Sequence, residues 1–308
     1  MPILHAIILG ITQGLSEFLP ISSSGHLELV PWLFGWDDFA ADPDLETTFD
    51  VALHMGTLVG AVAYFRSDIV RLGTAGLGAL SRRSSGAGVG SVSAARSAGS
   101  SAETGVELAP GGDGTVGDRD ASLAWLLLLS AVPAGITGLL FEDTFAEIAE
   151  EHWLIGTLLI VFGLVLLVAD RLGGEREADR FRVRDALLMG LAQAAALQPG
   201  VSRSGVTITT ARALGFRRDS AARLSFLMSL PIIAGVGLYK GADVLLGDGI
   251  PSGFLAAFAA GMVASGITGY AAVWATLRLV RTRTFTPFVI YRCIVGAGVI
   301  LLVVSGVR

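Results

Sequence analysis

The chain has 308 residues, of which 52% are hydrophobic and only 16% charged, and its formal net charge is −5. With a mean hydropathy of +0.66, this composition excludes an ordinary soluble globular protein and indicates several membrane-spanning helices. The acidic balance argues against a nucleic-acid partner, and the single cysteine, Cys293, excludes an intrachain disulfide and a metal site built from cysteines.

The first apolar region, residues 3–34, is interrupted by the polar stretch EFLPISSSGH at residues 17–26. An ionisable side chain inside the membrane costs about 2.5–3.5 kcal/mol on insertion scales, so it marks a functional position by default. Irregular backbone at membrane depth is tolerated only where protein buries it or where it lines a wet cavity. The interruption therefore predicts a site on a helical hairpin that enters and leaves the membrane on one side.

Six further segments are long and apolar enough, or nearly so, to cross a membrane, which takes about 20 mostly apolar residues. They are residues 49–66, 122–141, 153–170, 221–239, 253–277 and 286–306. Between the first two, residues 81–120 are rich in glycine, serine and alanine and cannot bury a core, which predicts a disordered loop.

The loops that join these segments differ in charge from one side of the membrane to the other. Thirteen arginines lie in the three loops of one side, at residues 67–121, 171–185 and 278–285, whereas Lys240 is the only Lys or Arg in the loops of the other side. By the positive-inside rule, the arginine-rich side is cytoplasmic.

A second interrupted region, residues 186–215, repeats the first at an offset of 180 positions. Aligned without gaps, residues 6–25 and 186–205 share six identities in twenty pairs, and Gln13 and Ser22 are among the matched residues. Because an odd number of spans separates the two copies, their hairpins would enter from opposite sides and meet near the midplane.

The predicted fold is therefore an all-α polytopic membrane protein with an inverted-topology repeat, six transmembrane helices and two re-entrant helical hairpins. We expect a single membrane domain over residues 1–308, with repeat one at 1–170 and repeat two at 184–308. In each hairpin the outgoing half-helix begins at the interruption with a serine near its cap, so its free N–H groups and its dipole suit an anion.

The second interruption reads QPGVSRSGVT, residues 198–207, and contains a cation suited to phosphate. Arg203 carries five donors in a fork that matches phosphate oxygens. Ser202, Ser204 and Thr207 add hydroxyl groups, and Gly200 and Gly205 let the backbone approach a ligand closely. With the carboxylate, hydroxyls and imidazole of residues 17–26, this set suits phosphoryl transfer, in which positioning and charge stabilisation supply most of the catalysis.

The pair of motifs QGLSEFLPISSSGH and PGVSRSGVT resembles the undecaprenyl-diphosphate phosphatase family, the bacitracin-resistance type of membrane phosphatase. The family pattern falls on Gln13 and Glu17, on Ser22 to His26, and on Pro199 to Thr207. The resemblance extends to TTFDVALHMGTLVG, RLSFLMSLP and FTPFVIYR, so it covers most of the chain outside residues 81–120. The chain departs from better-studied members in having Gln13 as the first member of the acidic pair and in its long loop.

The resemblance implies hydrolysis of undecaprenyl diphosphate, or a similar polyprenyl diphosphate, to the monophosphate and inorganic phosphate. It implies a divalent cation, Mg²⁺ or Ca²⁺, held by Glu17, and an arginine clamp on the diphosphate from Arg203. Ser23 is the implied nucleophile or phosphate ligand, with His26 as its base or as acid to the leaving group. Whether Ser23, His26 or a metal-bound water attacks the phosphorus stays open. The substrate-binding residues would be Gln13, Ser22, Ser24, Gly200, Ser202, Ser204 and Thr207.

The same resemblance implies a multi-pass protein of the plasma membrane whose partners are the lipid substrate and the bilayer, and it leaves a homodimer open. The catalytic cleft would open to the outer side. Hydrolysis there would recycle the lipid carrier for envelope glycan synthesis and would oppose bacitracin, which sequesters the substrate.

Structural roles compete with several of these assignments. Arg203 and Glu17 can form an ion pair that only supports the fold, and the serines can be helix caps. We interpret His54 as a structural residue more readily than as a site residue, whereas Asp50 suits a solvated helix start or a metal site equally well. A secondary transporter or flippase of lipid phosphates is the rival function, since inverted repeats with broken helices are a transporter design. An intramembrane serine protease is a weaker third reading, because it leaves Arg203 without a role.

Overall fold

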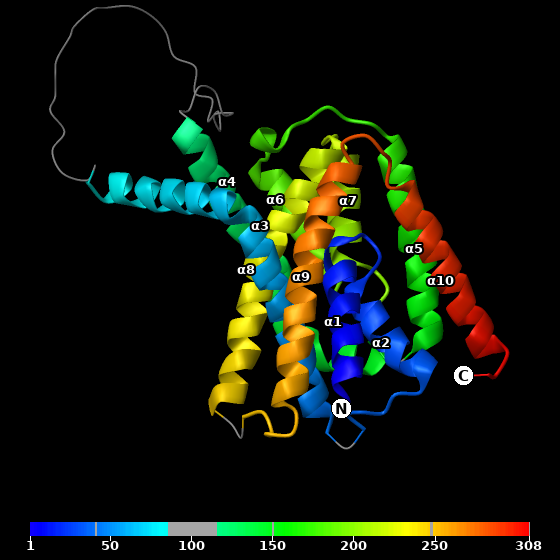
Figure 1. Cartoon of the computed structure of the whole chain (residues 1–308). Helices are drawn as coiled ribbons and strands as arrows, with labels where there is room; N and C mark the ends of the chain where they lie inside the picture. Colours follow the sequence, from blue (N-terminus) through cyan, green and yellow to red (C-terminus); the bar gives the residue numbers. More distant parts are fainter. Residues whose placement is uncertain (41, 86–115, 150, 247–248, 308) are drawn as a thin grey trace, which may run out of the picture. The chain divides into compact units, whose positions relative to one another are not determined.

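A computed structural model describes residues 1–40, 42–85, 116–149, 151–246 and 249–307 (Figure 1). Within these residues the chain is helical and forms no named strand, which confirms the predicted all-α class. It divides into two compact units, one made of Met1–Arg66 with Leu126–Arg308 and the other of Ser67–Trp125.

Ten α-helices follow one another in the described part of the chain. They are α1 (Ile3–Phe18), α2 (Ser23–Phe34), α3 (Pro43–Ser85), α4 (Val116–Ala149), α5 (His152–Arg171), α6 (Val183–Ala195), α7 (Arg203–Ala213), α8 (Arg218–Leu246), α9 (Leu255–Leu279) and α10 (Thr286–Val304). Six of them, α3, α4, α5, α8, α9 and α10, contain a stretch long and apolar enough to cross a membrane, so the six predicted spans are confirmed in number and order.

The ends of the predicted disordered loop, residues 81–120, are helical in the structure. Helix α3 continues to Ser85 and α4 begins at Val116, so the prediction is wrong at both margins, and residues 86–115 lie outside the described part of the chain. Within the smaller unit, Arg71 forms ion pairs with Asp68 and Asp120, which ties the end of α3 to the start of α4. Ion pairs between side chains cannot be deduced from the glycine, serine and alanine content on which the prediction of disorder rested.

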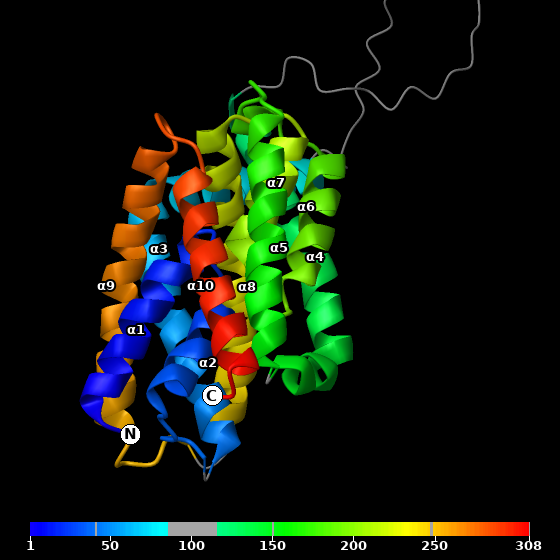
Figure 2. The ribbon, with the colours of Figure 1, turned by 90° about the vertical axis from the view of Figure 1, so that its right-hand side faces the viewer.

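Both interrupted regions consist of a helix, a short break and a second helix. In each, the second helix starts after a serine with positive φ, Ser22 at 79° and Ser202 at 75°. This backbone region is uncommon for residues other than glycine. Each serine accepts a hydrogen bond at its Oγ from the backbone N–H three residues later, as a helix N-cap does. Figure 2 shows α1 and α2 toward the end of the larger unit at which the N-terminus lies, and α6 and α7 toward the opposite end.

Helix α1 packs closely along α9 through small residues. An added methyl group at Gly10 would overlap the carbonyl of Gly261, and one at Gly14 would overlap Ser265 and Thr268. Small residues let two membrane helices approach until their backbones touch, which gains dispersion contacts in a solvent that supplies no hydrophobic force. This contact fixes the position of α1, whose last two turns carry Gln13 and Glu17.

Gly10→Ala is expected to destabilise the protein by about 1–3 kcal/mol, because the extra carbon must push α1 away from α9. The measurement is thermal unfolding of the purified protein in detergent. Gly135→Ala is the matched control, since a methyl group at Gly135 meets nothing within 4 Å and alanine favours the helix. Equal unfolding temperatures for the two variants would contradict the packing argument.

Candidate functional site

Glu17, in the last turn of α1, is the centre of a buried polar cluster. Its side chain is 4% exposed and both carboxylate oxygens have partners. Arg203 Nη2 donates to Oε1 at 2.9 Å, while Oε2 accepts from Gln13 Nε2 at 2.9 Å and from Ser23 Oγ at 2.7 Å. The structure thus brings together residues that are 186 positions apart, and the expectation that Arg203 lies beside residues 17–26 is confirmed.

Arg203 is the first residue of α7 and spans the space between three elements. Besides the Glu17 carboxylate, its guanidinium donates to the Glu17 carbonyl at 3.2 Å and to the Ser225 carbonyl of α8 at 3.3 Å. The ion pair with Glu17 is the structural alternative considered above, and it is present. The arginine side chain still keeps 14% of its surface exposed, so the fork is not fully enclosed by protein.

The two breaks contact each other directly. Ser22 Oγ accepts from the Gly200 N–H at 3.1 Å, and Ser204 Oγ donates to the Leu19 carbonyl at 2.9 Å. The first turns of α2 and α7 therefore meet, and the positive ends of two helix dipoles converge on one place. Such a place suits an anion with several charged oxygens.

The glycines of the second break lie against protein atoms. Gly200 has a φ of +93°, and a methyl group there would overlap the Ile155 carbonyl of α5. At Gly205 a methyl group would meet the Arg292 guanidinium and Ser202. Both glycines are required for close approach of protein to protein, and approach of a ligand to their backbone stays a prediction.

The hydroxyl groups of the second break also bond protein atoms. Ser202 caps α7, Ser204 reaches the first break, and Thr207 Oγ1 bonds Ser225 Oγ at 2.7 Å. All three residues are buried. The structure shows them holding the meeting point together, and their direct contact with substrate stays a prediction, as it does for half-buried Ser24.

His26 in α2 does not pair with Ser23. Its Nδ1 donates to the Ser22 carbonyl at 2.6 Å, and its Nε2 lies 2.8 Å from the hydroxyl of Tyr291 on α10. Because a carbonyl only accepts, Nδ1 carries the proton and Nε2 of the neutral ring accepts from Tyr291. The implied Ser23–His26 pair is therefore replaced in the structure by Ser23 with Glu17 and His26 with Tyr291.

Arg292 is the residue that sequence reasoning missed. It is fully buried, and its guanidinium donates to carbonyls of both breaks: Pro20 at 3.2 Å, Gly200 at 2.9 Å and Val201 at 3.0 Å. Two more bonds reach Leu158 and Leu159 of α5. The signal was available, since an arginine in the apolar span 286–306 is costly and by default functional.

His54, interpreted above as structural, faces the cluster from α3. Its Nε2 lies 3.6 Å from Glu17 Oε2, and its side chain is 33% exposed. Gln13 is fully buried and its Oε1 has no hydrogen-bond partner, although its Nε2 bonds Glu17. An unpaired buried oxygen beside a carboxylate and an imidazole fits a divalent cation in the kinds of donor present.

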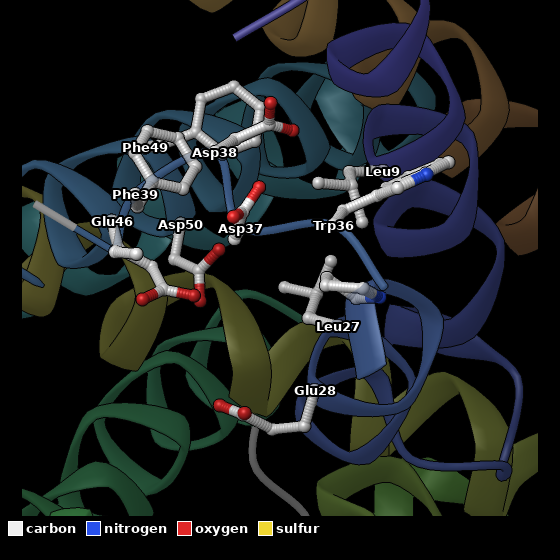
Figure 3. A pocket seen from close by; sticks show the side chains of 12 residues that line it. Leu9, Leu27, Glu28, Trp36, Asp37, Asp38, Phe39, Glu46, Phe49 and Asp50 are labelled. Atoms are coloured by element: carbon white, nitrogen blue, oxygen red, sulfur yellow. The ribbon is translucent and has the colours of Figure 1, made fainter. Parts of the chain in front are cut away.

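An acidic pocket of about 300 Å³ lies in the same unit and is lined by residues of α1, α2 and α3 and of the segment between α2 and α3. Figure 3 shows Asp37, Asp38, Glu46 and Asp50 around this space, with Glu28 below. None of Glu17, Ser23, His26 and Arg203 lines it. Asp50, for which a solvated and a metal-binding role were equally suited, therefore borders this pocket, and the described residues contain no group of three His, Cys, Asp or Glu arranged around one ion.

The chain is similar over almost its whole length to known proteins. The family model described as "Bacitracin resistance protein BacA" matches residues 6–298. Among curated relatives, an undecaprenyl-diphosphatase of Geobacter sulfurreducens is 45% identical over 97% of this chain and 98% of its own length. One from Pelobacter propionicus is 44% identical over 100% and 99%, and one from a Nocardioides species 40% identical over 99% and 97%.

Proposed function

Because the chain belongs to the BacA family of bacitracin resistance proteins, we infer that it is an undecaprenyl-diphosphatase of multi-pass membrane type. It hydrolyses undecaprenyl diphosphate to undecaprenyl phosphate and inorganic phosphate, and so returns the lipid carrier to envelope glycan synthesis. A transporter reading is not favoured, because the matched relatives bear the name of a phosphatase.

The observation that carries the proposal in the structure is the bonding of Ser23 and Arg203 to opposite oxygens of Glu17. One carboxylate thereby positions two groups on its two oxygens. The Ser23 hydroxyl can attack phosphorus, and the Arg203 guanidinium can hold phosphate oxygens. A carrier needs the cation and the helix ends, but it has no use for an oriented hydroxyl.

We assign the steps of hydrolysis to these side chains. The diphosphate lies at the meeting helix ends, with Arg203 on its non-bridging oxygens. Ser23 Oγ forms a bond to the terminal phosphorus, its proton passes to Glu17, and the bond to the bridging oxygen breaks to release undecaprenyl phosphate. Water then cleaves the phosphoserine and releases phosphate. Phosphoryl transfer passes through a loose transition state, in which the attacking oxygen forms little bond. Glu17 therefore contributes to the rate more by orienting the Ser23 hydroxyl than by removing its proton.

Glu17 would also hold the divalent cation, Mg²⁺ or Ca²⁺, together with the unpaired oxygen of Gln13. Such an ion supplies charge neutralisation of the diphosphate and is typically bound through one or two carboxylates and the substrate phosphates. In the substrate-free arrangement the charge of Arg203 is already offset by Glu17, so a further positive charge is needed to bind a multiply charged anion.

The membrane arrangement that we propose is the inverted repeat with two re-entrant hairpins and a cleft open to the outer face of the plasma membrane. It is supported by the matching cap geometry of Ser22 and Ser202 and by the arginine-rich loops of the opposite side. The homodimer left open by the sequence is not part of this proposal.

The test is release of inorganic phosphate from purified protein across several prenyl diphosphates, with the divalent cation varied. We expect hydrolysis of undecaprenyl diphosphate that depends on the metal. Movement of the lipid across vesicles without phosphate release would overturn the enzyme in favour of the flippase.

Glu17→Gln is expected to weaken metal activation, because the amide carries no charge for the cation. The concentration of Mg²⁺ that gives half-maximal phosphate release should rise by about tenfold or more, a shift of the size found when metal-site residues are changed. Glu28→Gln is the matched control, since that carboxylate borders the separate acidic pocket. An unchanged titration for Glu17→Gln would remove this residue from the metal site.

A further inference from the structure

The orientation of His54 leaves one nitrogen directed at Glu17. Its Nδ1 bonds the Asp50 carbonyl at 2.7 Å, so Nδ1 carries the hydrogen and the lone pair of the neutral ring is on Nε2. That lone pair lies 3.6 Å from Glu17 Oε2. Two acceptors thus face each other at a distance too long for a hydrogen bond.

The separation instead matches two ligands of one metal ion. Nitrogen and oxygen ligands lie about 2.1 Å from a first-row ion, and at the tetrahedral angle two such ligands are about 3.4 Å apart. Gln13 adds the third donor: its Nε2 is engaged with Glu17, and its buried Oε1 has no partner. Two groups therefore present lone pairs that no hydrogen bond in the structure satisfies, His54 Nε2 and Gln13 Oε1, and both neighbour the Glu17 carboxylate, whose Oε2 already accepts from Gln13 Nε2 and Ser23 Oγ.

We propose that His54 is a ligand of the divalent cation through Nε2, beside Glu17 Oε2 and Gln13 Oε1. The inference rests on the proposed function and names a metal ligand that the two sequence motifs do not contain, since His54 comes from α3. The carboxylate and amide oxygens suit Mg²⁺, Ca²⁺ and Mn²⁺ alike, so Mn²⁺ can replace the cation named above as a probe of this site. Substrate phosphates and water complete the ion's shell.

The charges around His54 agree with a cation at this place. Glu17 of α1 places a carboxylate oxygen 3.6 Å from His54 Nε2, and Arg203 lies on the other oxygen of that carboxylate. Helix α9 reaches α3 beside His54 through Ser265, which is uncharged and donates to the Leu53 carbonyl. An ion between Glu17 Oε2 and His54 would therefore not share its carboxylate oxygen with Arg203, which bonds Oε1.

His26 provides an internal comparison. It also donates from Nδ1 to the carbonyl four residues earlier, but its Nε2 is occupied by the Tyr291 hydroxyl. Two histidines with the same ring orientation thus differ in one respect, which is whether Nε2 is open to a metal.

The experiment uses Mn²⁺ as probe, with methylenediphosphonate as a diphosphate that is not hydrolysed, on the full-length protein in detergent. Pulsed electron paramagnetic resonance detects the ¹⁴N nucleus of an imidazole bound directly to Mn²⁺. The signal of the unbound aqueous ion, followed as Mn²⁺ is added, gives the dissociation constant. We expect ¹⁴N modulation in the wild type and in His26→Gln. We expect its loss in His54→Gln, together with binding weakened by about tenfold or more.

His54→Glu separates loss of a ligand from loss of folding. It should restore Mn²⁺ binding without ¹⁴N modulation, since a carboxylate replaces the imidazole. Absence of ¹⁴N modulation in the wild type, or its persistence in His54→Gln, would overturn the proposal. Phosphate release by a wild type that lacks the ¹⁴N signal would refute His54 as ligand and leave the proposed function standing. A ¹⁴N signal in a wild type that hydrolyses no prenyl diphosphate would support His54 as ligand and refute the proposed function.

Discussion

Arg203→Lys is expected to lower kcat/KM for phosphate release from undecaprenyl diphosphate by about 10²–10³-fold, although the charge is kept. The guanidinium donates at once to the Glu17 carboxylate, the Glu17 carbonyl and the Ser225 carbonyl, which a single ammonium group cannot reproduce. Loss of one preorganised donor to a transition-state oxyanion has effects of this size. The measurement is initial rate against substrate concentration at saturating metal.

Arg278→Lys is the control for that variant, because Arg278 is an exposed arginine at the end of α9. Its rate should stay within about twofold of the wild type, as expected for a surface change away from the site. If Arg203→Lys also turned over near the wild-type rate, the forked contact with phosphate would be wrong, and Arg203 would be a structural partner of Glu17.

Ser23→Ala is expected to reduce kcat by about 10³-fold or more. Removal of a nucleophile leaves only the catalysis supplied by binding and charge. The Ser23 hydroxyl donates to Glu17 Oε2 at 2.7 Å, so its loss also frees one position on the carboxylate. Rapid quenching with a radiolabelled terminal phosphate should trap a phosphoprotein in the wild type and none in the variant.

Ser229→Ala is the matched control, because that buried hydroxyl bonds only the Phe226 carbonyl of its own helix in the described contacts. It should keep the wild-type rate to within a few-fold. A Ser23→Ala protein that hydrolysed substrate at the wild-type rate would move the attack to water and leave Ser23 as a phosphate ligand.

Local patterns were sufficient to predict the elements and the two breaks. A span of apolar residues or a serine before a half-helix is a property of neighbouring positions, so the six spans and the caps at Ser22 and Ser202 follow from the sequence alone. The meeting of Arg203 with Glu17 was predictable as well, because the inverted repeat expected from the sequence would bring the two breaks together.

Contacts between helices could not be predicted in the same way. Tyr291, Arg292 and His54 reach the site only because of the rotation of α10 and α3 about their axes, which is set by packing against neighbours. For the same reason the sequence did not reveal that Gly200 approaches α5, or that Ser204 bonds the first break.

The location of Arg292 determines when during biosynthesis the enzyme becomes competent. Its guanidinium is bonded to backbone carbonyls of both breaks, yet it belongs to α10, which follows α1 to α9 in the chain and is synthesised after them. A nascent chain that has inserted α1 through α9 already contains every side chain assigned to the chemistry but lacks the group that ties the two interruptions together. Early release of such a chain yields a membrane protein without a closed phosphate receptor, and a stop codon before residue 292 should be as damaging as loss of the whole second half.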